Sequence, residues 1–417
     1  MKRTLILLAA AFIGGSPSIA YADSALVIES WRNDDLNIWQ DTIIPAFEKA
    51  HPDIKVTFQP TAPTEYDGAL SAKLESGTAG DLITCRPFDK SLQMFQKNQL
   101  SALNDLSGMD NFSAIAKVAW TTDDGKSTFC VPMAAVIHGF FYNKDAFKKL
   151  EIQAPTTWDE FFADVDKIKK DGTYTGVALG TPDQWEAAYM GYLNIGPNYW
   201  KGEDGRLALI KGAQKLTDPA WVEPMKTMAR MSAYMGDGYK AQSYPDSQNL
   251  FELGRAAIYP TGSWEISGFR AGAKFELGVF PPPVLKAGDP CYITDHDDIA
   301  LGLNANSKNK EAAKVFLSWV ASPEFATLYA NALPGFFSLS NAKVELKDPL
   351  AQEFLSWRGK CKSTIRATYQ ILSRGKPTLD TELGVETSNV VNGTETPEAA
   401  MKKLQDGLAN WYAPQKN

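Results

Sequence analysis

The chain has 417 residues, of which 44% are hydrophobic, and a formal net charge of −7 at pH 7. This length exceeds what one hydrophobic core usually serves, so we expect two domains. The acidic balance, and the lack of a basic run with interleaved aromatic residues, argue against nucleic acid as a partner.

The N-terminus has the pattern of a secretory signal peptide over residues 1–22. Two basic residues precede an apolar run that ends at Ile13, and Ala20 and Ala22 supply the small residues that define a cleavage site. The run is far shorter than the roughly 20 residues that span a bilayer. The next residue, Asp23, is not the cysteine that a lipid anchor requires. We therefore expect a free periplasmic protein.

Apolar runs alternate with helical periodicity after the signal peptide. Strands are predicted at residues 25–29, 54–59 and 81–85. The helix between the first two is kinked or restarted by Pro45, and the helix between the last two begins with Thr64 as its N-cap. Their buried faces are predicted to be Trp39, Ile43 and Phe47, and Tyr66, Leu70 and Leu74. This βαβαβ order predicts an α/β fold with mostly parallel, doubly wound sheets.

Metal and cofactor chemistry have little support. The chain contains four cysteines, which are Cys85, Cys130, Cys291 and Cys361. They lack the clustered spacing of a zinc site, and one or two disulfides are compatible with them, with the pairing left open. The run Asp295–Asp298 lacks the spaced ligands of a calcium loop, and Gly125–Ser127 lacks the context of a phosphate loop. We expect no metal and no cofactor.

Six segments resemble, in order and spacing, the carbohydrate-specific solute-binding proteins of ABC importers, the maltose-binding-protein-like family. They are FEKAHPDIKV (47–56), SGTAGDLITC (76–85), VPMAAVIHGFFYNKDAF (131–147), FELGRAAIYPTGSWEI (251–266), NANSKNKEAAKVFLSWVASPE (304–324) and TPEAAMKKLQDGL (396–408). The resemblance covers essentially the whole mature chain. It implies a periplasmic monomer that captures a carbohydrate and hands it to a membrane permease served by a separate ATPase.

The resemblance also implies a type II-like periplasmic binding protein fold, in which two discontinuous lobes are joined by a hinge. The N-terminal lobe is predicted to comprise residues 23–132 and 285–334, and the C-terminal lobe residues 137–280 and 338–417. The crossovers between them are predicted at residues 133–136, 281–284 and 335–337. Crossing chains of this kind allow the lobes to rotate about their connections.

Sugar capture requires aromatic faces and planar polar groups on the loops at strand ends. In the first lobe the predicted contacts are Trp31, Asn33, Asp34, Asp35, Arg86 and Asp89. Arg86 and Asp89 stand where the family carries polar sugar contacts, and the alternative for both is a salt bridge that caps the next helix. Val136 replaces a family acid, so His138, on the same strand face, is a candidate substitute unless it is a hydrogen-bonded core residue.

The second lobe supplies most of the remaining candidates, which are Asp183, Gln184, Trp185, Tyr244, Gln248, Gly262, Ser263, Trp264 and Arg366. Asp295 and His296 are further candidates at the point where the chain is predicted to return to the first lobe. Trp264 aligns with a family tryptophan that lies under the bound sugar. Asp183 has an alternative role as an acid in the first turn of a helix.

Three alternatives to sugar transport remain open. A glycosidase leaves no local signature, although the chain has only three histidines and neither GxSxG nor HExxH. A lectin-like sugar binder would lack the hinge. A binder of polyols would share the cleft and differ only in its ligand.

Overall fold

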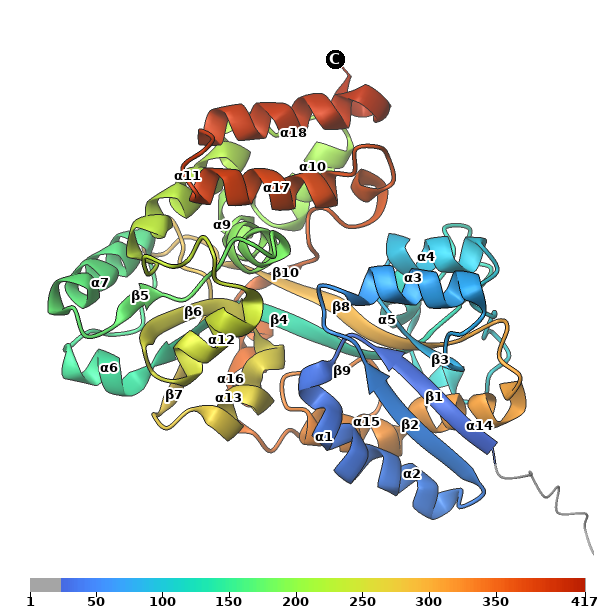
Figure 1. Ribbon diagram of the computed structural model, residues 1–417. Helices are drawn as coiled ribbons and strands as arrows, with labels where there is room; N and C mark the ends of the chain where they lie inside the picture. The colour runs from blue at the N-terminus through green and yellow to red at the C-terminus, as the bar shows by residue number, and fades with distance from the viewer. Residues whose placement is uncertain (1–23, 417) are drawn as a thin grey trace, which may run out of the picture.

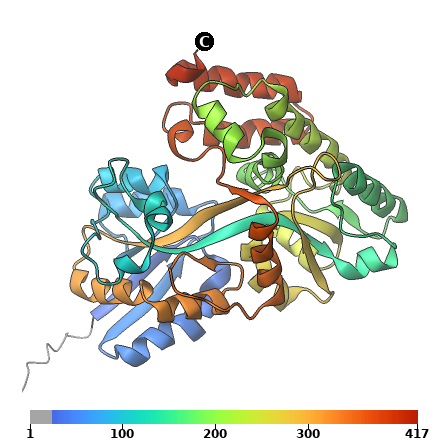
Figure 2. The ribbon, with the colours of Figure 1, turned by 180° about the vertical axis from the view of Figure 1, so that it is seen from behind.

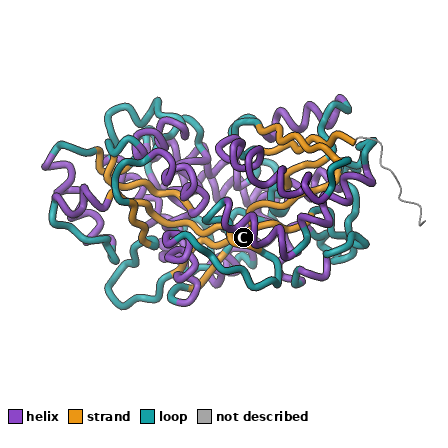
Figure 3. The backbone as a smooth tube through the Cα atoms, turned by 90° about the horizontal axis from the view of Figure 1, so that it is seen from below, coloured by secondary structure: helices purple, strands orange, loops and turns teal. Residues whose placement is uncertain are grey.

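The computed structural model describes residues 24–416, so the predicted signal peptide lies outside the described residues. Strands and helices alternate along the chain and form two lobes, with the strands inside and most helices outside (Figures 1 and 3). The sheet follows the order β2-β1-β3-β8-β4-β6-β5, and β7, β9 and β10 pair beside this path. The predicted α/β fold of two lobes is confirmed.

The first lobe is built on parallel strands. β1 (Ser24–Ser30) pairs in parallel with β2 (Ile54–Pro60) and β3 (Leu82–Cys85), and β3 pairs antiparallel with β8 (Tyr292–Leu303). Its helices are α1 (Leu36–Ile38), a π-helical segment (Trp39–Ile43), α2 (Ile44–Ala50), α3 (Tyr66–Ser76), α4 (Asp89–Gln96), α5 (Ala114–Lys117), α14 (Lys310–Val320) and α15 (Pro323–Ala332).

The predicted helix faces are buried, but one predicted helix start is wrong. Trp39, Ile43 and Phe47 are at most 2% exposed, and Pro45 stands in the first turn of α2, directly after the π-helical segment. Helix α3 begins at Tyr66 rather than after a Thr64 cap. The carboxylate of Asp67, three residues after Thr64, pairs with Arg86 and Lys90.

The second lobe surrounds a mixed sheet in which antiparallel pairs prevail, so the prediction of mostly parallel sheets is wrong there. β4 (Val131–Asn143) pairs antiparallel with β6 (Ala256–Gly262), β7 (Leu277–Phe280) and β9 (Phe337–Ser338), β5 (Thr175–Val177) pairs in parallel with β6, and β10 (Lys362–Thr364) with β8. Its helices are α6 (Lys144–Lys149), α7 (Trp158–Asp171), α8 (Leu193–Ile195), α9 (Pro197–Trp200), α10 (Glu203–Ile210), α11 (Pro219–Met231), α12 (Tyr244–Glu252), α13 (Ile266–Gly272), α16 (Pro349–Ser356), α17 (Leu379–Val391) and α18 (Pro397–Trp411).

Two separate hydrophobic cores mark the lobes, and the strands β4 and β8 run from one to the other (Figure 2). On β4, Val136 packs in the first core and Ile137 in the second. On β8, Ile293 packs in the second core and Ile299 packs in the first. The chain therefore returns to the first lobe between residues 293 and 299, later in the sequence than the predicted crossover at 281–284. The last passage lies between Phe336 and Phe337, within the predicted segment.

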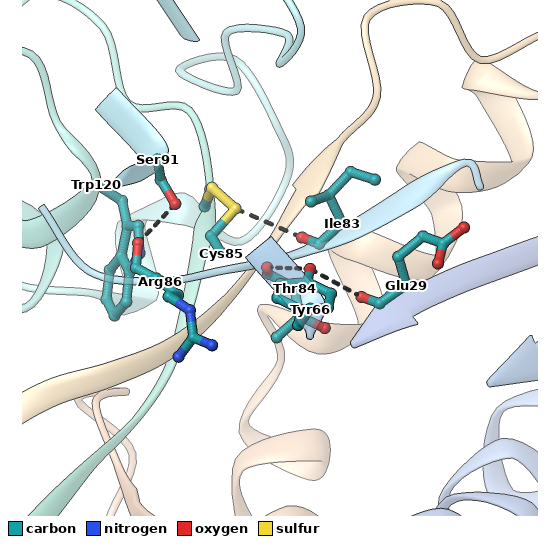
Figure 4. Close-up of a disulfide and its surroundings, with 9 residues drawn as sticks. Glu29, Tyr66, Ile83, Thr84, Cys85, Arg86, Ser91 and Trp120 are labelled. Carbon is teal, nitrogen blue, oxygen red and sulfur yellow. Dashed lines mark hydrogen bonds between the residues drawn. A yellow bond between two sulfur atoms is a disulfide. The ribbon is translucent and has the colours of Figure 1, made fainter. Parts of the chain in front are cut away.

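Two disulfides settle the pairing that the sequence left open. Cys85 pairs with Cys130, and Cys291 pairs with Cys361. The first bond ties the end of β3 to the residue before β4, directly beside Arg86 (Figure 4). The Arg86 carbonyl accepts hydrogen bonds from the Ser91 hydroxyl at 2.6 Å and the Trp120 indole at 3.1 Å, so the backbone of this loop is held from several sides.

Within residues 24–416, no helix is long and apolar enough to cross a membrane. In the same range no group of three or more histidine, cysteine or acidic side chains is arranged to hold a metal ion.

Candidate functional site

A cleft of about 320 Å³ lies between the lobes and is lined from both. The first lobe contributes the loop after β1, the start of α3 and the loop after β3, and the second lobe contributes helix starts and loops around residues 183–190, 244, 264 and 366–384. Eight predicted contacts line it, namely Trp31, Arg86, Asp183, Gln184, Trp185, Tyr244, Trp264 and Arg366. The topology thus brings together residues that lie more than 300 positions apart in the sequence.

Aromatic rings form one wall of the cleft. The rings of Trp185 and Tyr244 lie 4.8 Å apart, and the Trp264 indole N–H donates to the Tyr244 hydroxyl oxygen at 3.2 Å. The hydroxyl in turn donates to Glu265, which also accepts from the Gln248 amide at 3.0 Å. Burial raises the pKa of Glu265 to about 7. Glu265 therefore fixes Tyr244 and, through it, Trp264, although it does not line the cleft itself.

An ionic cluster from three elements forms the wall in the first lobe. Arg86 donates to Asp67 at 2.6 Å, and Lys90 donates to the second oxygen of the same carboxylate at 2.8 Å. Burial opposes ionisation of Asp67, but Arg86 and Lys90 outweigh it and lower its pKa. The Arg86 guanidinium also lies 4.5 Å from the Trp31 ring, a cation–π contact that orients both side chains.

Two buried histidines, His138 and His296, lie beside Arg366, and their protonation determines which of its N–H groups have an acceptor. Nδ1 of His296 lies 2.7 Å from the Asp297 carbonyl oxygen, which only accepts, so Nδ1 carries the proton. Burial and the nearby Arg366 charge hold the pKa of both histidines well below the usual value, so both are neutral. His138 therefore donates from Nε2 to Nε2 of His296, 3.1 Å away.

This proton arrangement leaves Arg366 with free donors. Its Nη2 lies 3.3 Å from His138 Nε2, which already carries a proton, and only Nη1 has a clear acceptor, the Tyr369 hydroxyl at 2.9 Å. Its Nε is buried and has no hydrogen-bond partner in the described chain. Among residues 24–416, no carboxylate lies close enough to form an ion pair with it.

Asp298 is the matching acceptor in the cleft. It lines the cleft half-buried, and within residues 24–416 its carboxylate accepts no hydrogen bond. Burial raises its pKa, although the charges of Arg366, Arg32 and Arg86 act in the opposite direction. Asp298 and Arg366 thus present an acceptor and a donor that the protein itself leaves unused.

The family model for bacterial extracellular solute-binding proteins matches residues 32–327. The chain belongs to this family. Among curated relatives, the multiple sugar-binding protein of Streptococcus mutans serotype c is 26% identical over 73% of this chain and 71% of its own length. The sn-glycerol-3-phosphate-binding periplasmic protein UgpB of Yersinia pseudotuberculosis serotype I is 23% identical over 87% of this chain and 86% of its own.

Solved structures of solute-binding proteins share the fold. The receptor AcbH, described with a preference for b-D-galactopyranose, has a TM-score of 0.79 at 19% identity, covering 94% of this chain and 100% of its own. A chitin oligosaccharide binding protein has a TM-score of 0.78 at 20% identity with the same coverage. At these identities the similarity concerns the fold.

Several predicted contacts of this solute-binding protein lie outside the cleft lining. Asn33 and Asp34 are exposed, and Asp35 forms a buried ion pair with Arg32 at 2.7 Å. Ser263 is buried, where its hydroxyl bonds to the backbone of Ile137 and Gly335. The remaining predicted residues outside the lining are Asp89, His138, Gln248, Gly262, Asp295 and His296.

Two predicted acids are bound by distant arginines instead. Asp295 accepts two hydrogen bonds from Arg358, both at 2.8 Å, and Asp89 accepts one from Arg374 at 2.7 Å. Asp89 therefore forms a salt bridge, as the alternative interpretation predicted. Its partner is the distant Arg374 rather than a residue near the start of the helix.

The structure adds residues to the cleft that the sequence did not single out. They are Arg32, Pro63, Thr64, Asp67, Pro87, Lys90, Tyr189, Met190, Asp298, Tyr369, Asp380, Thr381 and Gly384. Asp298 stands at a break in the register between β8 and β4, where the alternation of strand faces does not hold, so spacing along the sequence gives no signal for it.

Proposed function

We propose that this solute-binding protein captures a carbohydrate in the interlobe cleft and delivers it to the membrane permease of an ABC importer. The wall of Trp185, Tyr244 and Trp264, combined with the unused polar pair Asp298 and Arg366, carries the proposal. Flat rings pack against the apolar C–H faces of a sugar, and planar charged groups pair with its hydroxyls.

The relatives support the same function. One is named a multiple sugar-binding protein, and solved neighbours include a complex with raffinose and one with acarbose. We propose further that the protein acts as a periplasmic monomer, that a separate ATPase powers the permease, and that the sugar is released chemically unchanged.

A polyol phosphate is the second candidate ligand. The unpaired guanidinium of Arg366 would suit a phosphate, and UgpB relatives are named for sn-glycerol-3-phosphate. The free carboxylate of Asp298 in the same cleft would repel that phosphate, whereas it would accept the hydroxyls of a neutral sugar. The observations therefore favour a neutral ligand.

A thermal-shift screen of the purified mature protein tests the proposal. Neutral mono- and oligosaccharides, polyols and sn-glycerol-3-phosphate are compared. We expect a neutral sugar to raise the melting temperature, because a ligand at 100 times its Kd adds about 2.7 kcal/mol. Chromatography should recover that sugar unchanged. Stabilisation by sn-glycerol-3-phosphate alone would overturn carbohydrate binding, and appearance of a cleaved product would show an enzyme.

Asp298→Asn should weaken binding of the sugar found in that screen by about ten-fold, because the amide replaces an acceptor of two hydroxyls with a poorer one. Titration calorimetry measures the loss. Asp295→Asn is the matched control, since Asp295 lies on the same strand outside the cleft and pairs with Arg358. Equal affinities of the two variants would remove Asp298 from the site.

A further inference from the structure

An ionic bridge joins the two lobes at a distance from the ligand cleft. Arg374 donates from Nε to Asp89 at 2.7 Å, and from Nη1 and Nη2 to the two oxygens of Asp123 at 2.8 and 3.0 Å. We propose that Arg374 is a positioning residue that sets ligand affinity by stabilising the closed arrangement of the lobes, without contacting the ligand.

The two sides of the bridge belong to different cores. Asp89 opens α4, whose Leu92 packs in the first core, and Asp123 follows Trp120 of the same core. Arg374 follows Leu372, which packs in the second core. The three contacts therefore exist only while the lobes are together, and rotation apart about the crossing strands breaks them all.

Burial makes the Asp89 contact the stronger of the two. The Asp89 side chain is 9% exposed and that of Asp123 is 64% exposed. The second oxygen of Asp89 is buried and has no hydrogen-bond partner within residues 24–416. Closing the lobes thus takes a carboxylate out of water, and Arg374 is the cation that offsets this cost. The contact with Asp123 is bidentate, but its exposure to solvent makes it weaker than the buried contact with Asp89.

The bridge lies apart from the proposed ligand contacts. Asp89, Asp123 and Arg374 line a second cavity of about 590 Å³, and none of them lines the ligand cleft. The rings of Phe88 and Tyr369, 5.2 Å apart, stand between the two spaces: Phe88 lines the second cavity and Tyr369 the cleft. An effect of Arg374 on affinity must therefore act through lobe closure.

Linkage gives the expected size of that effect. The apparent Kd of a ligand that needs the closed form equals its intrinsic Kd divided by the closed fraction. A lost charge-assisted hydrogen bond that leaves a buried carboxylate unpaired lowers the ratio of closed to open forms by about ten-fold or more. The apparent affinity then falls by the same factor as the closed fraction.

Distance measurement by electron paramagnetic resonance tests the bridge on the protein without any ligand, so the outcome does not depend on the proposed sugar. Spin labels are placed on exposed helix positions of the two lobes by Ala72→Cys on α3 and Lys402→Cys on α18. The four native cysteines are paired, so only the new ones react. In Arg374→Gln we expect the ratio of the short-distance to the long-distance population to fall by about ten-fold.

Two further variants separate the bridge from general loss of structure. Asp123→Asn should change the distances little, because that contact is exposed. Adding Asp89→Asn to Arg374→Gln should restore much of the short-distance population, because no carboxylate is then left unpaired. A wild-type protein without a short-distance population, an unchanged distribution in Arg374→Gln, or a double variant as open as the single one would each overturn the proposal.

Discussion

Gly262→Ala is expected to weaken ligand binding by about 100-fold, roughly 2.7 kcal/mol, while the protein stays folded. The backbone is not the reason, since Gly262 has an extended conformation with φ of −146° that alanine adopts freely. A methyl group at this position would lie 1.9 Å from the Trp264 ring. The indole must therefore move, and its hydrogen bond to Tyr244 is lost with it.

Calorimetry with the best sugar and thermal unfolding together check this result. Gly268→Ala is the matched control, because that glycine lies exposed in α13, four residues after Trp264, and a methyl group there meets nothing within 4 Å. Trp264→Ala supplies the affinity expected when the ring is absent. Wild-type affinity in Gly262→Ala would mean that Trp264 does not contact the ligand.

The free energy of unfolding of Glu186→Gln should be compared with that of wild type at pH 4.5 and at pH 8.5. We expect this difference to shift in favour of the variant by roughly 4 kcal/mol between the two pH values. Glu186 is fully buried, and burial, with the nearby charges of Asp183 and Glu265, raises its pKa to about 8. The folded state therefore keeps a proton that the unfolded state has released. For wild type, the stability from this group is present below the unfolded pKa near 4.5 and is lost as the pH rises through 8.

Urea unfolding at both pH values measures the difference. Glu265, whose pKa is also raised, remains in both proteins, so its contribution cancels in the comparison except for the part that depends on the charge of Glu186. Glu345→Gln on the exposed surface is the control and should change stability by the same small amount at each pH. A Glu186→Gln variant whose stability falls with pH as steeply as that of wild type would contradict the assigned ionisation.

Local signals in the sequence predicted the fold well. The apolar runs and periodic helix faces at residues 25–85 are short-range patterns, and the structure forms β1, α2, β2, α3 and β3 there. Trp185, Tyr244 and Trp264 were also recognisable, because each follows or precedes a strand or helix end where an α/β sheet presents its ligand.

Long-range partners explain what the sequence did not predict. Asp89 and Asp295 resemble free ligand groups until Arg374 and Arg358 are seen beside them, and these partners are 285 and 63 residues away. Tyr369 lies in an irregular segment after β10 and Asp380 is the second residue of α17, and neither position carries a spacing signal that would place it at the cleft. Side-chain pairing of this kind is determined by tertiary packing rather than by spacing along the chain.

The order of the two disulfides has a consequence for biogenesis. Each bond joins neighbours in the order of the cysteines, Cys85 with Cys130 and then Cys291 with Cys361, and each lies within one core. If the chain is exported N-terminus first, as its predicted signal peptide implies, oxidation of each cysteine with the next one to emerge produces the native pairs without a disulfide isomerase. Because neither bond spans the two cores, covalent cross-linking stiffens each half and leaves their mutual rotation free.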